Sequence, residues 1–154
     1  IFGREILKER PGATFVSEVK CSQALYDELT KAGGRPIMWK VGHSLIKKKM
    51  KEEKAVLAGE MSGHMFFADR YFGFDDAVYA AARLCELLSR GERTLADIVD
   101  TLPVLYNTPE LRLDCPDDLK FEVVARAAAY FKERYPVVDI DGARVQFPGG
   151  WGLV

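Results

Sequence analysis

The sequence predicts an α/β domain built on a mostly parallel sheet, followed by a small α+β unit. Helical and strand-forming segments alternate over the first 60 residues, which is typical of βαβ units with right-handed crossovers. Beyond residue 109 the expected order changes to strand, helix and hairpin. With 48% hydrophobic and 29% charged residues among 154, the composition is that of a globular protein. Two domains are therefore expected, 1–103 and 104–154.

Punctuating residues separate the first elements. Ser22 is suited to cap a helix, and Gly33-Gly34 is suited to end it. The expected elements are, in order, a helix over 2–10, a strand over 13–19, a helix that begins after Ser22, a strand over 35–41, a helix over 45–54 and a strand over 55–58.

Three further elements are expected to complete the first domain. An edge strand is predicted over 64–67, and Asp75 or Asp76 is suited to cap the long helix that follows. Thr94 is expected to cap a short helix over 94–102. The predicted inner face of the long helix consists of Phe74, Val78, Ala81, Ala82, Cys85 and Leu88.

The second domain is expected to contain one helix and a hairpin. A strand is predicted over 110–115 and a helix over 117–134. Asp141-Gly142 is a hairpin signal between strands over 137–140 and 143–147, and a last strand is predicted over 151–154. The expected inner face of the helix consists of Leu119, Val123, Ala127 and Phe131.

Charge and apolar patterning argue against two classes of partner. A net charge of −1 gives no electrostatic case for nucleic acid, and no apolar run approaches the roughly 18 residues that a bilayer requires. Three scattered cysteines indicate neither a disulfide framework nor a zinc site, so a cytoplasmic location is expected. The chain begins in an apparent helix and ends on an apolar run, so we expect an internal fragment of a longer protein.

Polar clusters follow three of the predicted strands. They are Lys20, Gly42-His43-Ser44 and the six-residue motif Gly59-Glu60-Met61-Ser62-Gly63-His64. Because the carboxyl ends of parallel strands meet at one edge of a sheet, these clusters are expected to converge on one crevice. This convergence predicts a ligand site.

The motif after the third strand carries the most varied chemistry. Glu60 and Ser62 lie two apart, so in an extended segment they point the same way and are suited to two adjacent sugar hydroxyls. His64 continues that series and is suited to proton transfer. Gly63 lets the backbone approach a ligand. A locally satisfied polar turn between strands is an equally good interpretation on spacing alone.

Each neighbouring feature has a functional and a structural interpretation. His43 at a helix start is suited to an anion, or is incidental to a capping turn. Lys20 is a phosphate or hydroxyl contact, or a solvated turn residue. The run 47–51 is expected to be a solvated helix face, and the aromatic stretch 66–74 to be core. The aspartates have no metal-loop spacing, so no metal is expected within this chain.

A family resemblance rests on five segments in the family's order. The motif 59–64 resembles the sugar-recognition loop of the α-D-phosphohexomutases, and Met61 is typical of bacterial members that use mannose and glucose phosphates. The supporting segments are Val19-Lys20-Cys21, Lys40-Val41-Gly42-His43-Ser44-Leu45-Ile46-Lys47, Phe72-Gly73-Phe74-Asp75-Asp76 and Gly150-Trp151-Gly152-Leu153-Val154.

The resemblance implies a monomeric four-domain enzyme. Residues 1–103 would be most of its three-layer third domain with a mixed sheet, and 104–154 the start of a fourth domain like the TATA-binding protein. The family interconverts hexose 1- and 6-phosphates through a bisphosphorylated sugar such as glucose 1,6-bisphosphate, using a phosphoserine and Mg²⁺. Neither the phosphoserine loop nor the magnesium loop has a counterpart here, so the chain alone is expected to be inactive.

The resemblance also implies roles for individual residues. Glu60 and Ser62, with Gly63, would hold the sugar through O3 and O4, and His43 would support ligand binding. His64 and Lys20 would lie near the transferring phosphate as catalytic groups. Two alternatives stay open: a relative that acts on glucosamine phosphate, and a non-catalytic module that binds sugar phosphates.

Overall fold

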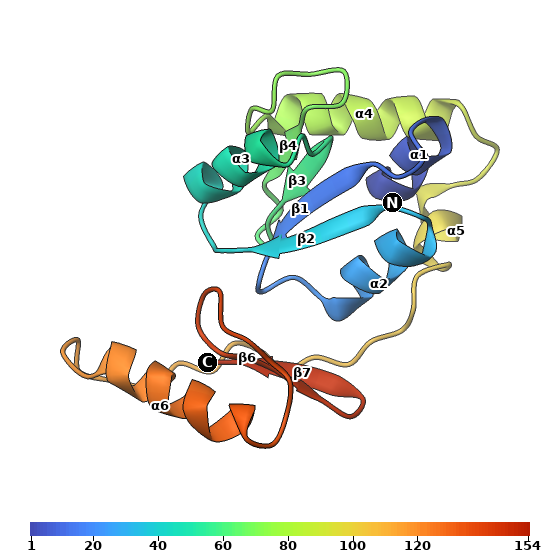
Figure 1. The fold of residues 1–154 in the computed structure, drawn as a ribbon. Helices are drawn as coiled ribbons and strands as arrows, with labels where there is room; N and C mark the ends of the chain where they lie inside the picture. The colour runs from blue at the N-terminus through green and yellow to red at the C-terminus, as the bar shows by residue number, and fades with distance from the viewer. The chain divides into compact units, whose positions relative to one another are not determined.

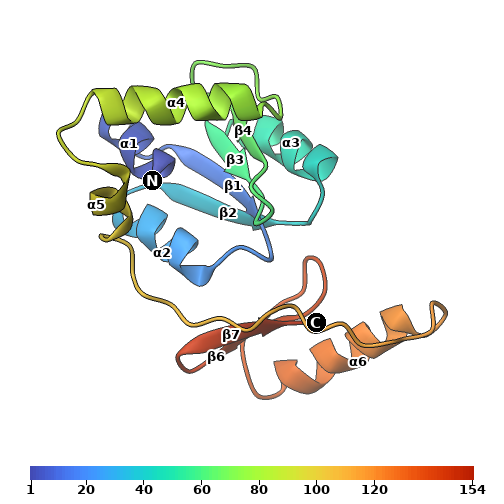
Figure 2. The same cartoon turned by 180° about the vertical axis from the view of Figure 1, so that it is seen from behind.

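The computed structural model describes residues 1–154. The chain divides into two compact units, Ile1–Pro103 and Val104–Val154, which are described separately. Figures 1 and 2 trace both units from opposite sides. None of the helices combines the length and the apolar character needed to cross a bilayer.

The first unit is built on a four-stranded mixed sheet. Its strands are β1 (Thr14–Glu18), β2 (Arg35–Trp39), β3 (Leu57–Gly59) and β4 (Met65–Phe67), in the spatial order β2-β1-β3-β4. Strand β1 lies parallel to both β2 and β3, whereas β4 lies antiparallel to β3 at the edge. The predicted α/β fold with a mixed, mostly parallel sheet is confirmed.

Helices cover both faces of this sheet, as Figure 1 shows. They are α1 (Phe2–Glu9), α2 (Gln23–Lys31), α3 (His43–Glu52), α4 (Ala77–Ser89) and α5 (Leu95–Val99). Side chains of α1, α2 and α4 pack with Phe15 and Phe67 on one face. Side chains of α3 pack with Val16 and Phe66 on the other. Successive strand residues point to opposite faces, so the neighbours Phe66 and Phe67 serve the two cores, which gives three layers.

Local signals in the sequence set several boundaries. The Ser22 hydroxyl accepts from the amide of Ala24 at 3.3 Å and caps α2, as expected. Thr94 and Asp97 form a reciprocal capping box at α5. These caps satisfy amides that have no partner inside their helices.

The predicted inner face of α4 is wrong. The residues expected inside are largely exposed, with Val78 82% exposed, and Tyr79, Ala80 and Arg83 face inward instead. Polar and aromatic anchors set the rotation of the helix. The Tyr79 ring stacks on Tyr71 at 3.8 Å, and the Arg83 guanidinium pairs with the buried Asp69 at 2.8 Å. These contacts turn Val78, Ala81 and Cys85 of the predicted face towards solvent.

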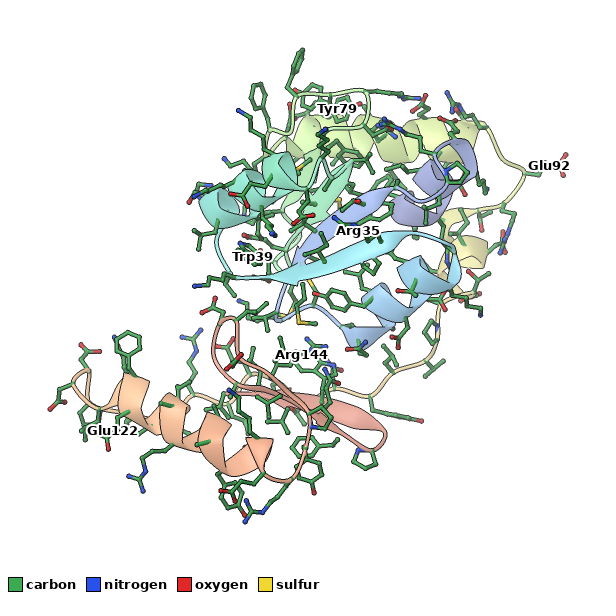
Figure 3. All side chains as sticks on the ribbon, in the orientation of Figure 1. Arg35, Trp39, Tyr79, Glu92, Glu122 and Arg144 are labelled. Carbon is green, nitrogen blue, oxygen red and sulfur yellow. The ribbon has the colours of Figure 1, made fainter.

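The second unit holds a helix and an antiparallel sheet. Its elements are α6 (Lys120–Lys132), β5 (Val137–Val138), β6 (Arg144–Phe147) and β7 (Gly150–Leu153), with strand order β5-β6-β7. Gly142 has a φ of +77° in the β5–β6 hairpin, and a Cβ there would lie 2.4 Å from the Val154 carbonyl oxygen. The buried Arg144 (Figure 3) stacks its guanidinium over the Trp151 ring at 3.7 Å.

Two predictions for this unit are wrong. No strand forms over 110–115, where Leu111 and Leu113 are 78% and 88% exposed. A strand-like sequence forms a strand only when it pairs with a neighbour, and this segment pairs with none of β5, β6 and β7. Helix α6 turns Phe131 towards Phe147, with ring centroids 6.0 Å apart, but Val123, expected inside, is 46% exposed.

Candidate functional site

The topology brings the three predicted polar clusters to one edge of the sheet. Strands β1, β2 and β3 are parallel, so their carboxyl ends coincide. Lys20 follows β1, Gly42-His43 follows β2, and residues 60–64 follow β3. We refer to these last five residues as the 60–64 loop. The expected placement of the three clusters at the carboxyl ends of the strands therefore agrees with the strand order.

The 60–64 loop is a tight reversal between two antiparallel strands. The Glu60 amide donates to the His64 carbonyl at 3.0 Å, and the Gly63 amide donates to the Glu60 carbonyl at 3.0 Å. Gly63 has a φ of +95°, a conformation that glycine adopts without strain. The prediction that Glu60, Ser62 and His64 share one face of an extended segment is wrong, because the chain turns within those five residues.

The turn nevertheless brings the expected carboxylate and hydroxyl together. The Ser62 hydroxyl lies 3.4 Å from Glu60 Oε2 and donates to it. The other carboxylate oxygen, Glu60 Oε1, is buried and has no hydrogen-bond partner in the chain. A buried acceptor without a partner is costly. Because the Glu60 side chain as a whole is only half-buried, rotation of the carboxylate would let this oxygen accept from a donor that a ligand supplies.

Glu18, which sequence reasoning missed, binds the 60–64 loop through a hydrogen bond. This residue ends β1 and is 1% exposed. Its Oε1 accepts from the backbone amide of Met61 at 2.8 Å, across 43 positions of sequence. The Tyr26 hydroxyl donates to the Glu18 carbonyl at 2.8 Å. A glutamate between Ser17 and Val19 at the end of a predicted strand is the signal that could have identified it, because an acidic side chain is rarely buried without a partner.

His64 is held by Asp75, the second residue whose role the sequence did not reveal. Its Nδ1 lies 2.8 Å from Asp75 Oδ2, and the His64 side chain is 52% exposed. An ionised carboxylate only accepts hydrogen bonds, so Nδ1 carries a proton. In the neutral ring, Nε2 therefore holds the free lone pair. The helix cap is the neighbouring Asp76, whose Oδ1 accepts from the Tyr79 amide at 2.8 Å.

The remaining two site residues follow β2 and β1, which both lie on the same side of β3 in sheet order. His43 is the first residue of α3 and is exposed. It follows Gly42, which has a φ of +119°, and no side chain caps the helix. The start of α3 thus combines free amides, a partial positive charge and an imidazole, which suits an anion. Lys20 is half-buried beside β1.

The charge run on α3 has mixed roles. Lys49 pairs with Glu53 at 2.8 Å and lies 4.4 Å from the centre of the Trp39 ring. The Lys47 ammonium lies over the Phe66 ring at 6.0 Å. Part of the run therefore holds α3 against the sheet, and the rest faces solvent as expected.

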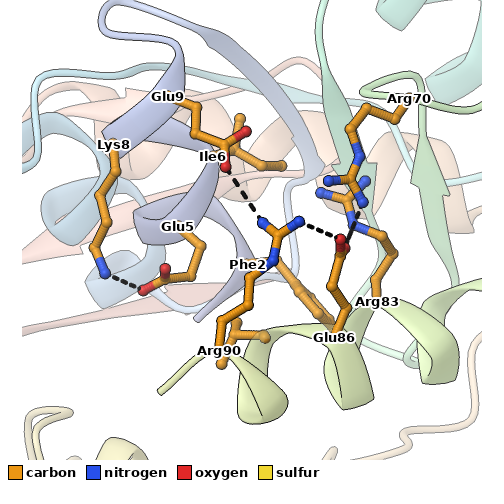
Figure 4. A pocket seen from close by; sticks show the side chains of 10 residues that line it. Phe2, Glu5, Ile6, Lys8, Glu9, Arg70, Arg83, Glu86 and Arg90 are labelled. Atoms are coloured by element: carbon orange, nitrogen blue, oxygen red, sulfur yellow. Dashed lines mark hydrogen bonds and ion pairs between the residues drawn. The ribbon is translucent and has the colours of Figure 1, made fainter.

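The cavity that Figure 4 shows belongs to a different part of the molecule. It lies between α1 and α4, has a volume of about 90 Å³ and contains no residue of the 60–64 loop among its lining residues. Glu86 on α4 pairs with Arg70, with Arg83 at 3.5 Å and with Arg90 at 2.6 Å. Arg83 and Arg90 also pair with Asp69 and Glu9. The charged groups around this cavity therefore bind one another.

The donor set at the sheet edge does not fit a divalent metal. No group of three or more metal-ligating side chains gathers anywhere in the chain. The carboxylates of Glu18 and Asp75 are engaged by Met61 and His64, whereas Mg²⁺ needs several free oxygen ligands in octahedral geometry.

The fold and this edge agree with a known class of protein. The family model described as "Phosphoglucomutase/phosphomannomutase, alpha/beta/alpha domain III" matches residues 1–106. The chain therefore belongs to the phosphoglucomutase/phosphomannomutase family and contains its domain III. The α-D-phosphohexomutase resemblance seen in the sequence is confirmed.

Relatives match along the whole chain. The phosphomannomutase/phosphoglucomutase of Pseudomonas aeruginosa is 46% identical over 157 residues, covering 100% of this chain and 34% of the relative. The phosphoglucomutase of Neisseria gonorrhoeae is 42% identical with the same coverage. A crystal structure of a phosphoglucomutase/phosphomannomutase family protein from Burkholderia thailandensis superposes with a TM-score of 0.86 and 46% identity, over 99% of this chain and 32% of that one. The chain spans about a third of these relatives' length.

Proposed function

We propose that the chain is the sugar-binding part of a longer phosphohexomutase that interconverts hexose 1-phosphates and 6-phosphates. The observation that carries the proposal is the 60–64 loop, where a buried carboxylate oxygen of Glu60 lacks a partner beside the Ser62 hydroxyl. Family membership and the names of the relatives support it.

In this proposal the loop holds sugar hydroxyls that carry no phosphate. Glu60 accepts from one hydroxyl, and Ser62 both donates and accepts. Gly63 keeps the face of the loop open, since a Cβ there would meet nothing within 4 Å. A grip on the two ring hydroxyls O3 and O4 serves the bisphosphorylated sugar in both orientations, because neither hydroxyl is the site of transfer.

His64, Lys20 and His43 attend to the phosphate end. When a sugar hydroxyl attacks a phosphoryl group it loses a proton, and the Nε2 lone pair of His64 accepts it. In the reverse direction, the same nitrogen returns the proton to the leaving oxygen. Lys20 and the start of α3 at His43 offset the negative charge of the phosphate.

The rest of the longer protein completes the enzyme. Residues 1–103 serve as its third domain, and 104–154 begin a fourth domain like the TATA-binding protein. The phosphoserine, the Mg²⁺ ligands and a further phosphate-binding loop lie in other parts of that protein, which acts as a monomer with glucose 1,6-bisphosphate as activator. When bound there, Mg²⁺ neutralises charge on the transferring phosphoryl group.

The test uses the full-length protein that contains this chain. Mannose, glucose and glucosamine 1-phosphates are supplied in parallel with glucose 1,6-bisphosphate and Mg²⁺, and formation of the 6-phosphates is measured. Met61 leads us to expect turnover of the mannose and glucose compounds above that of glucosamine. Binding of all three without turnover would instead identify a non-catalytic module.

Glu60→Ala in the same protein tests the residue that carries the proposal. A hydrogen bond to a charged group contributes about 1.5–3 kcal/mol, so we expect kcat/KM to fall roughly 10- to 150-fold. Lys48→Ala, at an exposed position on α3, is the control and is expected to retain wild-type activity. Wild-type turnover by the Glu60 variant would refute the assigned role.

A further inference from the structure

We propose that Asp75 is a positioning residue, which fixes the tautomer and the ring orientation of His64 for proton transfer. The inference rests on the proposed mutase function and adds a residue to which the family resemblance gave no role. Its basis is the 2.8 Å contact between His64 Nδ1 and Asp75 Oδ2. Asp75 acts through His64 and does not itself contact the substrate.

The fold holds the Asp75 backbone on both sides. Asp75 forms an antiparallel bridge with Phe66, which is fully buried in β4. The next residue, Asp76, accepts from the Tyr71 hydroxyl at 2.5 Å and from the Tyr79 amide at 2.8 Å. The carboxylate that meets His64 therefore projects from a fixed segment, in contrast to most exposed ion pairs, which join two mobile side chains.

The consequence for His64 is chemical. With Nδ1–H committed to the carboxylate, Nε2 is the basic nitrogen of the neutral ring, and the His64 side chain as a whole is half-exposed. After Nε2 accepts a proton, the adjacent carboxylate stabilises the imidazolium. Without Asp75, the neutral ring would divide between two tautomers and rotate about its side-chain bonds, so fewer molecules would be ready to react.

The nearby charged groups do not substitute for Asp75. The carboxylate of Asp76 is occupied by Tyr71 and Tyr79. Glu60 meets His64 only through the backbone, where its amide donates to the His64 carbonyl. Lys47 of α3 lies over the Phe66 ring, and its ammonium group cannot accept a hydrogen bond from Nδ1–H.

A double-mutant cycle in the full-length protein separates positioning from a general structural role. Loss of a general acid–base group costs about 10²- to 10⁴-fold in kcat, so we expect His64→Ala to lose that much. Asp75→Asn is expected to lower kcat about 10-fold and to change KM less than about 2-fold. In the His64→Ala background, Asp75→Asn should have no further effect on kcat. The control is Asp100→Asn, at an exposed site after α5, which should match wild type.

The ¹⁵N chemical shifts of histidine give a second readout that does not depend on turnover. The full-length protein labelled at histidine is expected to show His64 as the Nδ1–H tautomer, and Asp75→Asn to shift its signals towards a mixture. Wild-type kcat in Asp75→Asn, an equal loss in both backgrounds, or an Nε2–H tautomer in the wild type would each overturn the proposal. Absence of turnover in the wild type would refute the mutase function, while the tautomer would still decide the role of Asp75.

Discussion

The 60–64 loop and the turn between β2 and α3 lie at the same edge of one sheet but are held by different means. The loop has two internal backbone hydrogen bonds, and carboxylates from β1 and from the segment before α4 bind it at Met61 and His64. The turn depends on the unusual φ of Gly42, and no side chain caps the helix after it.

The two halves of the candidate site are therefore prepared for a ligand in different ways. Hydrogen bonds that involve a charged group contribute about 1.5–3 kcal/mol each, so the 60–64 loop is fixed before any ligand arrives. The uncapped start of α3 leaves backbone amides available, and an anion can supply the missing partner. The 60–64 loop is preorganised, whereas the start of α3 would be completed by a ligand.

Glu18→Ala tests the preorganised half and should have the largest effect. It removes the acceptor of the Met61 amide, and loss of a hydrogen bond to a charged group costs about 1.5–3 kcal/mol of unfolding free energy. The loosened loop should also raise KM for the hexose phosphate. Urea denaturation and steady-state kinetics measure the two effects. Glu18→Gln keeps an acceptor oxygen, so its stability and KM should lie between those of the alanine variant and wild type. Equal KM values in all three proteins would contradict the preorganisation of the 60–64 loop by Glu18.

Gly42→Ala tests the other half. A Cβ at this position would have room, with Leu45 Cδ1 at 3.9 Å, so the cost comes from the φ of +119° alone. Backbone strain of this kind costs about 1–3 kcal/mol, which thermal unfolding would detect. Gly150→Ala, at a position with open space and no positive φ, is the control and should change stability by less than about 0.5 kcal/mol. Equal unfolding temperatures for the two variants would contradict the strain argument.

The smallest expected effect concerns the segment that carries Asp75. The Tyr71 hydroxyl, followed by the Tyr79 amide, lowers the pKa of the Asp76 carboxyl below its ordinary value. A lowered folded-state pKa contributes stability that is present above the unfolded pKa, near 3.9, and is lost as the pH falls through the folded pKa. Asp76→Asn should therefore lose stability at pH 7 and show a shallower decline in melting temperature under acid conditions. If the melting temperature of the variant falls as steeply with acid as that of wild type, Asp76 does not contribute to the pH dependence of stability.

The order of elements and the shared edge could be predicted because the signals are local. Alternating segments and residues such as Ser22 and Gly33-Gly34 set the boundaries, and parallel strands then place Lys20, His43 and the 60–64 loop together.

The failures share a different cause, which is dependence on distant partners. The role of Glu18 depends on the contact between β1 and the 60–64 loop. The role of Asp75 depends on the pairing of its segment with β4. The face of α4 was set by Tyr71 and Asp69 rather than by its own apolar stripe. The segment 110–115 has strand-like side chains but no strand to join.

The antiparallel direction of β4 limits how the 60–64 loop can vary. Gly59 pairs with Met65, so the five residues of the loop are enclosed within a hairpin whose second strand is buried on both faces. If one residue were inserted in the loop, the pairing register of β4 could shift by one position. Such a shift would exchange the faces of Phe66 and Phe67 and disturb both cores. The length of the loop is thus tied to hydrophobic packing on each side of the sheet. We expect specificity to change by substitution within a loop of constant length.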